Sequence, residues 1–194
     1  MPVTTIEWEN GHIKMIDQTR LPLDLIHLEI HDIETLAEAI KALRVRGAPA
    51  IGIAGAFGAL LGVQNLDDSD KSAFFDALEK TTTYLNATRP TAVNLSWALN
   101  RMKAAAHANR DKSVAGIKRI LQQEALLGMA KAEESLIGVD GSIDQAIGYY
   151  QELAAKYSES FQGQAAKERA EALTQNKKQI ESFYVKLNQQ ASKK

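Results

Sequence analysis

Residues 44–52 of this chain read Arg-Val-Arg-Gly-Ala-Pro-Ala-Ile-Gly and place guanidinium groups and small residues at the predicted start of a helix. Gly47 lets the backbone approach a ligand closely, and Pro49 suits the beginning of a helix, where a missing N–H group costs little. The free N–H groups of the first helical turn and the positive end of the helix dipole attract anions. The pattern is therefore typical of an anion site, although the same spacing also occurs where a helix is only capped.

A second segment, residues 88–97, repeats this arrangement. Arg89 and a proline again precede an apolar stretch with helical periodicity, and Thr88 or Thr91 is placed to cap the helix. Two arginine-bearing helix starts can converge on one phosphate group. The alternative is that Arg89 and Thr91 close a surface turn.

Together, these two segments resemble the N-terminal domain of the methylthioribose-1-phosphate isomerases. These enzymes are aldose–ketose isomerases of methionine salvage and belong to an initiation-factor-2B-like superfamily. Residues 6–8 (Ile-Glu-Trp), 17–22 (Asp-Gln-Thr-Arg-Leu-Pro) and 33–43 extend the resemblance, which covers residues 1–118.

The resemblance implies a substrate-binding set that consists of Arg46, Gly47, Ala48 and Arg89 in this chain. The guanidinium groups would bind phosphate oxygens through charge-assisted hydrogen bonds, and backbone N–H groups would orient the ligand. Asn94, one turn into the second helix, either reaches the same ligand or faces a neighbouring helix.

The resemblance also implies that catalysis uses a cysteine and an aspartate of a second domain. This chain contains no cysteine, and we recognise no counterpart of that domain after about residue 120. We therefore name no catalytic residue. We expect a protein that binds a sugar phosphate but does not isomerise it alone.

The composition excludes several other classes of protein. A net charge of −1 over 194 residues argues against a nucleic-acid partner, which would require a basic face. The lack of cysteine excludes disulfides and thiolate metal sites, and the one helix-spaced histidine pair, His27 and His31, straddles a predicted strand end. We expect no metal and no cofactor.

The N-terminus lacks the basic start and apolar run of a signal peptide, so a cytoplasmic protein is expected. Residues 47–63 are uncharged but fall short of the roughly 20 residues that span a membrane. They also consist largely of alanine and glycine. We predict a buried helix and no membrane partner.

Periodicity predicts an α+β fold that is mostly α, with a small N-terminal antiparallel sheet followed by a helical bundle. The strands are expected at 4–9, 12–16 and 25–30, with an Asn10-Gly11 hairpin turn between the first two. Helices are expected at 33–43 after an Asp32 cap, from Gly47, after Asp70, and after Pro90 with Trp97 in the core.

The remaining residues, 119–194, form a nearly continuous helical pattern that we treat as a second domain. Residues 125–130 and 143–153 resemble the two helices of a tetratricopeptide repeat, joined by a turn at 137–142. Residues 161–190 are predicted to form one long helix or two. Repeat helices bind proteins, so the alternative function is an interaction or scaffold protein that uses this tail for a protein partner or a homodimer.

Overall fold

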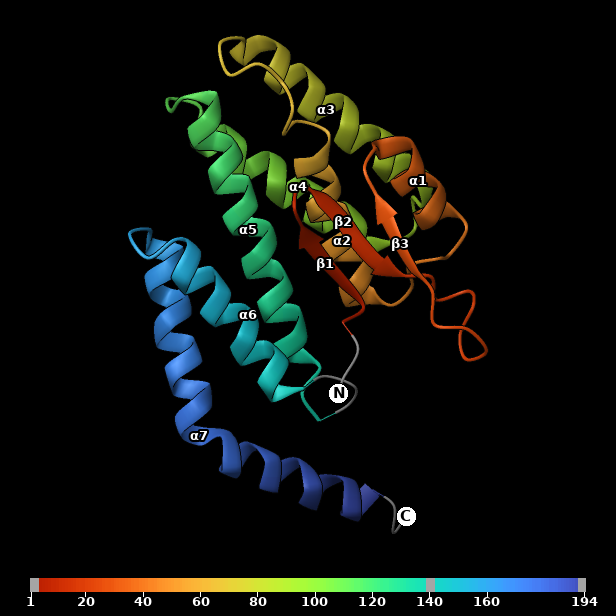
Figure 1. Ribbon diagram of the computed structural model, residues 1–194, viewed down its shortest axis with the longest axis vertical. Helices are drawn as coiled ribbons and strands as arrows, with labels where there is room; N and C mark the ends of the chain where they lie inside the picture. The colour runs from red at the N-terminus through yellow and green to blue at the C-terminus, as the bar shows by residue number, and fades with distance from the viewer. Residues whose placement is uncertain (1–3, 139–141, 192–194) are drawn as a thin grey trace. The chain divides into compact units, whose positions relative to one another are not determined.

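The computed structural model describes residues 4–138 and 142–191 (Figure 1). Within these residues the chain forms three strands and seven helices. In chain order they are β1 (Ile6–Glu9), β2 (His12–Ile16), β3 (His27–Ile30), α1 (Ile33–Lys41), α2 (Ala48–Leu61), α3 (Lys71–Thr88), α4 (Val93–Ala108), α5 (Val114–Ser135), α6 (Ile143–Lys156) and α7 (Phe161–Ala191). The predicted fold class, mostly helical with a small N-terminal antiparallel sheet, is confirmed.

The chain divides into two compact units, residues 1–125 and residues 126–194. The division falls within α5, and the predicted domain boundary between residues 118 and 119 lies in the same helix. No helix among the described residues is long and apolar enough to cross a membrane.

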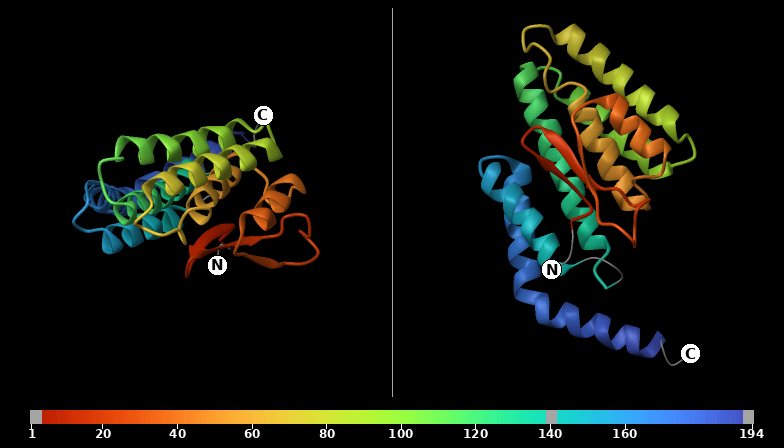
Figure 2. Two further views of the ribbon diagram at one scale, coloured as in Figure 1. Left: turned by 90° about the horizontal axis from the view of Figure 1, so that it is seen from above. Right: turned by 45° about the vertical axis from the view of Figure 1, so that its right-hand side comes forward.

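The sheet is an antiparallel meander with strand order β1-β2-β3. Asn10 and Gly11 join the first two strands with φ angles of 47° and 87°, which confirms the predicted hairpin turn. One face is buried by apolar side chains such as Ile13 and Ile30, and the ring of Trp8 lies 5.5 Å from that of Phe57 in α2. The sheet thus covers one side of α2, as Figure 2 shows. The third strand is shorter than predicted, because it begins at His27.

Helix α1 begins as predicted, since the Asp32 carboxylate accepts a hydrogen bond of 2.7 Å from the Thr35 N–H group. It ends earlier than predicted, at Lys41. Leu43 adopts a φ of 63°, and the N–H group of Arg44 returns to the carbonyl of Ala39 at 2.8 Å. This left-handed reversal satisfies the last carbonyls of the helix and leaves Leu43 42% exposed.

Helix α2 is the buried centre of the first unit, and its glycines allow neighbouring helices to approach closely. A Cβ atom on Gly55 would lie 2.8 Å from Leu95 of α4, and one on Gly58 would lie 2.5 Å from Leu36 of α1. The prediction of a buried helix rich in alanine and glycine is confirmed.

Helices α3 and α4 form the rest of this bundle. Asp70 caps α3 through the Ala73 N–H group at 2.8 Å, as predicted. The predicted threonine cap of α4 is wrong: Ala92 occupies the cap position without a side-chain hydrogen bond, and the Thr88 hydroxyl donates to the Leu85 carbonyl instead. The core assignment of Trp97 is also wrong. Its side chain is 61% exposed, because the helical repeat turns it away from the buried stripe that contains Leu95 and Leu99.

In the second unit, α6 packs against α7, which is one continuous helix of 31 residues. Ala170 and Leu173 of α7 are buried, and Glu134 of α5 accepts hydrogen bonds from Tyr150 of α6 at 2.8 Å and from Arg169 of α7 at 3.1 Å. Of the predicted turn at 137–142, residues 139–141 lie outside the described part of the chain. The tetratricopeptide-like organisation stays a prediction.

Candidate functional site

The start of α2 carries three of the four predicted binding residues. Gly47 is the N-cap, with a φ of 89° that favours glycine, and no described side chain caps the helix. The first helical hydrogen bond runs from Ile51 N–H to the Gly47 carbonyl at 3.1 Å, and Pro49 lies in the first turn without an N–H group to satisfy. Gly47 and Ala48 are exposed, so the positive end of the helix faces solvent.

Arg46, the third residue, is held against the segment that precedes β3. Its backbone N–H group donates to Oε1 of Gln18 at 3.0 Å, and its Nη2 donates to the Gln18 carbonyl at 2.7 Å. A guanidinium group has five N–H donors, so most of this one remains available for a ligand. The side chain is exposed beside the start of α2.

Arg44, two residues earlier, has a different role because it turns towards carboxylates. Its Nη1 donates to the buried Asp17 carboxylate at 2.6 Å, and Nε and Nη2 donate to Glu38 at 2.9 and 3.1 Å. These hydrogen bonds, those of Glu38 first, raise the pKa of the Arg44 guanidinium further above its ordinary value. Arg44 therefore anchors the loop, and Arg46 faces the solvent.

Asp17 is 3% exposed and ties the same loop to the sheet. Burial by itself raises the pKa of its carboxyl group, but hydrogen bonds from Thr19 and Arg44 outweigh burial and hold the pKa below its ordinary value. The N–H group of Gln18 also donates to the Arg44 carbonyl at 2.9 Å. The two segments, 27 residues apart in the sequence, thus form one unit that positions Arg46.

The start of α4 lies beside the start of α2 (Figure 1). Asn94 donates a hydrogen bond of 2.9 Å from its side-chain amide to the carbonyl of Ala48. A Cβ atom on Gly52 would lie 3.4 Å from the Asn94 carbonyl, and one on Gly55, further along α2, would lie 3.6 Å from Leu99, further along α4. The two helices therefore run in the same direction. The N-terminal ends of both helices therefore lie at the same exposed surface, and the Asn94 side chain faces α2.

Arg89 lies in the turn before α4. It is the C-cap residue of α3, and its carbonyl accepts a hydrogen bond of 2.9 Å from the N–H group of Ala92, the N-cap of α4. Its side chain is half-buried, and its guanidinium makes no hydrogen bond or ion pair with the described residues. Ala48 and Asn94 are thus in direct contact, and Arg46 and Gly47 adjoin Ala48 in the chain. Among the described residues, no hydrogen bond or ion pair joins the Arg89 side chain to this group.

Asp17 and Gln18 are not among the site residues that the sequence predicts. Both belong to residues 17–22, which contributed to the family resemblance, so the signal was present in the motif. Their side chains contact residues 27 and 28 positions away, and spacing alone cannot indicate such pairs. The side chains at the two helix starts supply mainly hydrogen-bond donors, which suits an anionic ligand.

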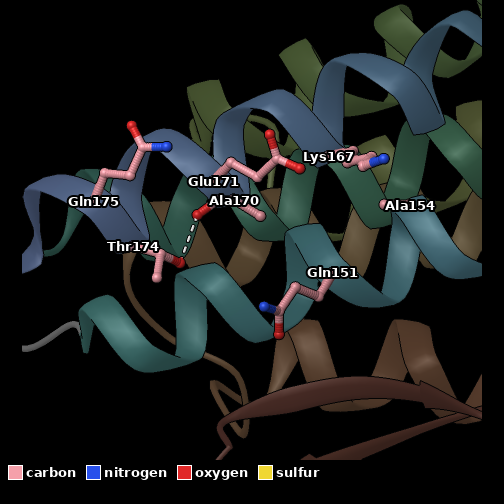
Figure 3. Close-up of a pocket in the computed structure, with 7 residues that line it drawn as sticks. All are labelled: Gln151, Ala154, Lys167, Ala170, Glu171, Thr174 and Gln175. Carbon is pink, nitrogen blue, oxygen red and sulfur yellow. Dashed lines mark hydrogen bonds between the residues drawn. The ribbon is translucent and has the colours of Figure 1, made fainter.

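A separate groove lies in the second unit, between α6 and α7 (Figure 3). It has a volume of about 390 Å³ and is lined by Gln151, Ala154, Lys167, Ala170, Glu171, Thr174 and Gln175. The Thr174 hydroxyl donates to the Ala170 carbonyl at 2.7 Å within its own helix. None of the predicted binding residues lines this groove.

The chain matches the model of the initiation factor 2 subunit family over residues 44–187. This match extends well into the segment for which the sequence predicted a tetratricopeptide-like tail. The resemblance recognised from the sequence motifs covers only residues 1–118.

Individual relatives are named as sugar 1-phosphate isomerases. The methylthioribose-1-phosphate isomerase of Geotalea uraniireducens is 44% identical over 126 residues, which are 65% of this chain and 36% of that protein. The 5-deoxyribose 1-phosphate isomerase of Moorella thermoacetica is 46% identical over 125 residues, 64% of this chain and 36% of that protein. This chain thus spans about a third of the length of the relatives it matches.

A solved structure supports the same relationship. The crystal structure of 5-methylthioribose 1-phosphate isomerase from Pyrococcus horikoshii superimposes with a TM-score of 0.63 and 38% identity. The superposition covers 75% of this chain and 39% of that one.

Proposed function

This chain belongs to the initiation factor 2 subunit family, and from that premise we propose that its first unit binds the phosphate group of a sugar phosphate. The observation that carries the proposal is the pairing of two helix starts, joined by the hydrogen bond between Asn94 and Ala48, beside the exposed Arg46. Two parallel helix dipoles and an arginine attract a phosphate dianion more strongly than one helix start does. The relatives that carry sugar 1-phosphates in their names favour this ligand class.

In the proposed complex, Arg46 and Arg89 bind phosphate oxygens through their guanidinium groups. Gly47 and Ala48 contribute backbone N–H groups at the start of α2, where the lack of a side-chain cap leaves them available. Asn94 keeps the two helix starts in register.

We further propose that this 194-residue chain by itself binds the ligand without isomerising it. Aldose–ketose isomerisation needs an acid and a base on two adjacent carbon atoms of the substrate. The family resemblance assigns chemistry to a cysteine and an aspartate of a second domain, and this chain contains no cysteine. The residues proposed to bind the phosphate offer donors and positive charge, not an acid–base pair.

Calorimetric titration of the purified chain with methylthioribose 1-phosphate tests binding directly. Arg46→Ala or Arg89→Ala is expected to weaken binding by about 1.5–3 kcal/mol, the usual contribution of a hydrogen bond to a charged group. Arg110→Ala is the matched control, because Arg110 follows the opposite end of α4. Unchanged binding in both site variants would contradict the assigned residues, and the unphosphorylated sugar should not bind.

An assay for the ketose product at high protein concentration tests the second part of the proposal. No turnover is expected. Formation of the methylthioribulose isomer in proportion to the protein added would show that the chain contains its own catalytic groups.

A second candidate function is protein recognition through the tail. Phe183, Val185 and Leu187 near the end of α7 are between 47% and 60% exposed, which is unusual for apolar side chains so close together. If they form an interface, Phe183→Ser with Leu187→Ser should abolish a homodimer or a partner complex of the full chain in sedimentation velocity. A monomer that captures no partner before or after this change would count against the tail as an interface.

A further inference from the structure

We propose that the outer face of the sheet contains a Zn²⁺ site formed by His12, Glu29 and His31. Each residue offers one ligand atom, and these atoms all lie within 4.8 Å of one another. Two imidazoles and one carboxylate are a ligand set that zinc uses where a water molecule completes its tetrahedron. The site is separate from the proposed phosphate site and does not rest on it.

The register of the sheet brings the three residues together. β2 and β3 pair Ile13 with Ile30. His12, the residue before Ile13, and His31, which follows the end of β3, therefore continue the same register and lie opposite each other. Glu29 precedes His31 by two residues and therefore points to the same side of β3. The opposite side of these strands is buried, so this cluster lies on the face that is turned away from α2.

The two imidazole rings are already close. Their centroids are 4.5 Å apart with an interplanar angle of 31°, and Nε2 of His31 lies 3.9 Å from Oε2 of Glu29. Ligand atoms on a tetrahedral zinc ion lie about 3.3 Å apart, given metal–ligand distances of about 2.0–2.1 Å. Glu29 and His31 are exposed, so rotation about their side-chain bonds can bring their ligand atoms towards half-buried His12 without a shift of the paired strands.

His12 provides a second, independent observation. Its Nε2 atom is shielded from solvent and has no hydrogen-bond partner among the described residues. Buried polar atoms are normally paired, so an unpaired imidazole nitrogen beside another histidine and a carboxylate calls for a partner. A metal ion that accepts the nitrogen lone pair would be such a partner.

The neighbouring charges leave Glu29 available. Lys14 lies opposite Glu29 in the register, but its amino group pairs with Glu9 at 3.2 Å and with Glu7 at 3.6 Å. This lysine is thereby neutralised by carboxylates on β1. Glu29 contacts His31 instead.

The sequence alone predicts no metal site. Its one histidine pair with helical spacing is His27 and His31, which are four positions apart. The pair that matters is separated by 19 positions and meets only through strand pairing.

Titration of the full chain, with any affinity tag removed and bound metal stripped by a chelator, tests the site. Calorimetry with ZnCl₂ in a phosphate-free buffer is expected to give one ion per chain. His12→Ala and His31→Ala should each weaken Zn²⁺ binding by roughly tenfold or more, since even residues that only support a ligand contribute on that scale. Co²⁺ added to the stripped chain should give the visible absorption of a four-coordinate ion, and this absorption should disappear in both variants.

The matched control is His27→Ala, which removes an exposed histidine from the same strand but outside the cluster. It should leave Zn²⁺ affinity unchanged. Glu29→Gln, which keeps the size of the side chain, should weaken binding without unfolding the sheet, as circular dichroism can verify. Equal Zn²⁺ affinity in the parent chain and the His12 and His31 variants, or no binding by the parent chain, would overturn the proposal.

Discussion

The carboxylate of Asp17 accepts a hydrogen bond of 2.6 Å from Nη1 of Arg44, which joins the segment after β2 to the loop that presents Arg46. Asp17 is buried, whereas Arg44 is partly exposed and also binds Glu38. The pair therefore positions Arg46, the residue proposed to bind phosphate, without contacting the ligand itself.

Asp17→Asn is expected to lower the free energy of unfolding by about 1.5–3 kcal/mol, because it weakens a hydrogen bond between charged groups in a buried setting. Urea denaturation measures the loss. Asp24→Asn is the control: Asp24 lies in the same loop but forms an exposed ion pair with Arg20, and such pairs contribute about 0–1 kcal/mol. Equal losses in both variants would argue against a special role for Asp17.

The same carboxylate predicts how stability depends on pH. Its pKa is lowered in the folded protein, so the folded state binds fewer protons than the unfolded state just below the ordinary aspartate pKa. The stabilisation is fully present above the unfolded pKa of about 3.9 and is lost as the pH falls through the folded value. Acid unfolding followed by circular dichroism should be less steep in Asp17→Asn. An identical acid profile would mean that Asp17 does not contribute.

Gly47 should be intolerant of a side chain for conformational reasons alone. A Cβ atom there meets nothing within 4 Å, but the φ of 89° is strained for other residues. Gly47→Ala is expected to cost about 1–3 kcal/mol of stability.

Gly148 is the opposite case, since it lies within α6, is exposed and also has free space around its Cβ position. Gly148→Ala should therefore stabilise the protein by about 0.5–1 kcal/mol. Thermal denaturation of the two variants measures the effect of backbone conformation, because neither added Cβ atom has a neighbour to clash with. The same sign for both changes would contradict this explanation.

Trp97 and Phe57 should differ sharply when replaced by alanine. Trp97 is 61% exposed, and its main described contact is the Arg101 guanidinium, 5.5 Å from the ring. Trp97→Ala is expected to cost about 1 kcal/mol or less. Phe57 is fully buried against Trp8, so Phe57→Ala should cost about 3–5 kcal/mol. A large loss of stability on removal of Trp97 would instead indicate that it is covered in solution.

Local features of the fold were predictable because their causes lie within a few residues. The Asn10-Gly11 turn, the Asp32 and Asp70 caps and the start of a helix at Gly47 all appear where the sequence indicated. The errors also have local causes. Helical periodicity predicts that the first helix continues through Leu43, but α1 ends at Lys41 because the chain reverses in a left-handed conformation at Leu43.

The candidate site was only partly predictable, because the motif identified donors but not their supports. Arg46 and Gly47 could be selected from residues 44–52, yet nothing in that segment indicates that Arg44 turns towards Asp17 while Arg46 remains exposed. That distinction depends on where the segment after β2 lies. It is therefore a property of the packed sheet and loop.

The sequence by itself determined the mostly helical class, the positions of the main turns and caps, and the two arginine-bearing helix starts, since these follow from backbone preferences and short-range hydrogen bonds. The tertiary structure decided which distant residues meet: Gln18 with Arg46, Asn94 with Ala48, and His12 with His31. Hydrogen bonds and metal coordination act over only a few ångströms. Whether residues 19 to 46 positions apart come within that reach is set by strand register and helix packing, which spacing along the chain does not encode.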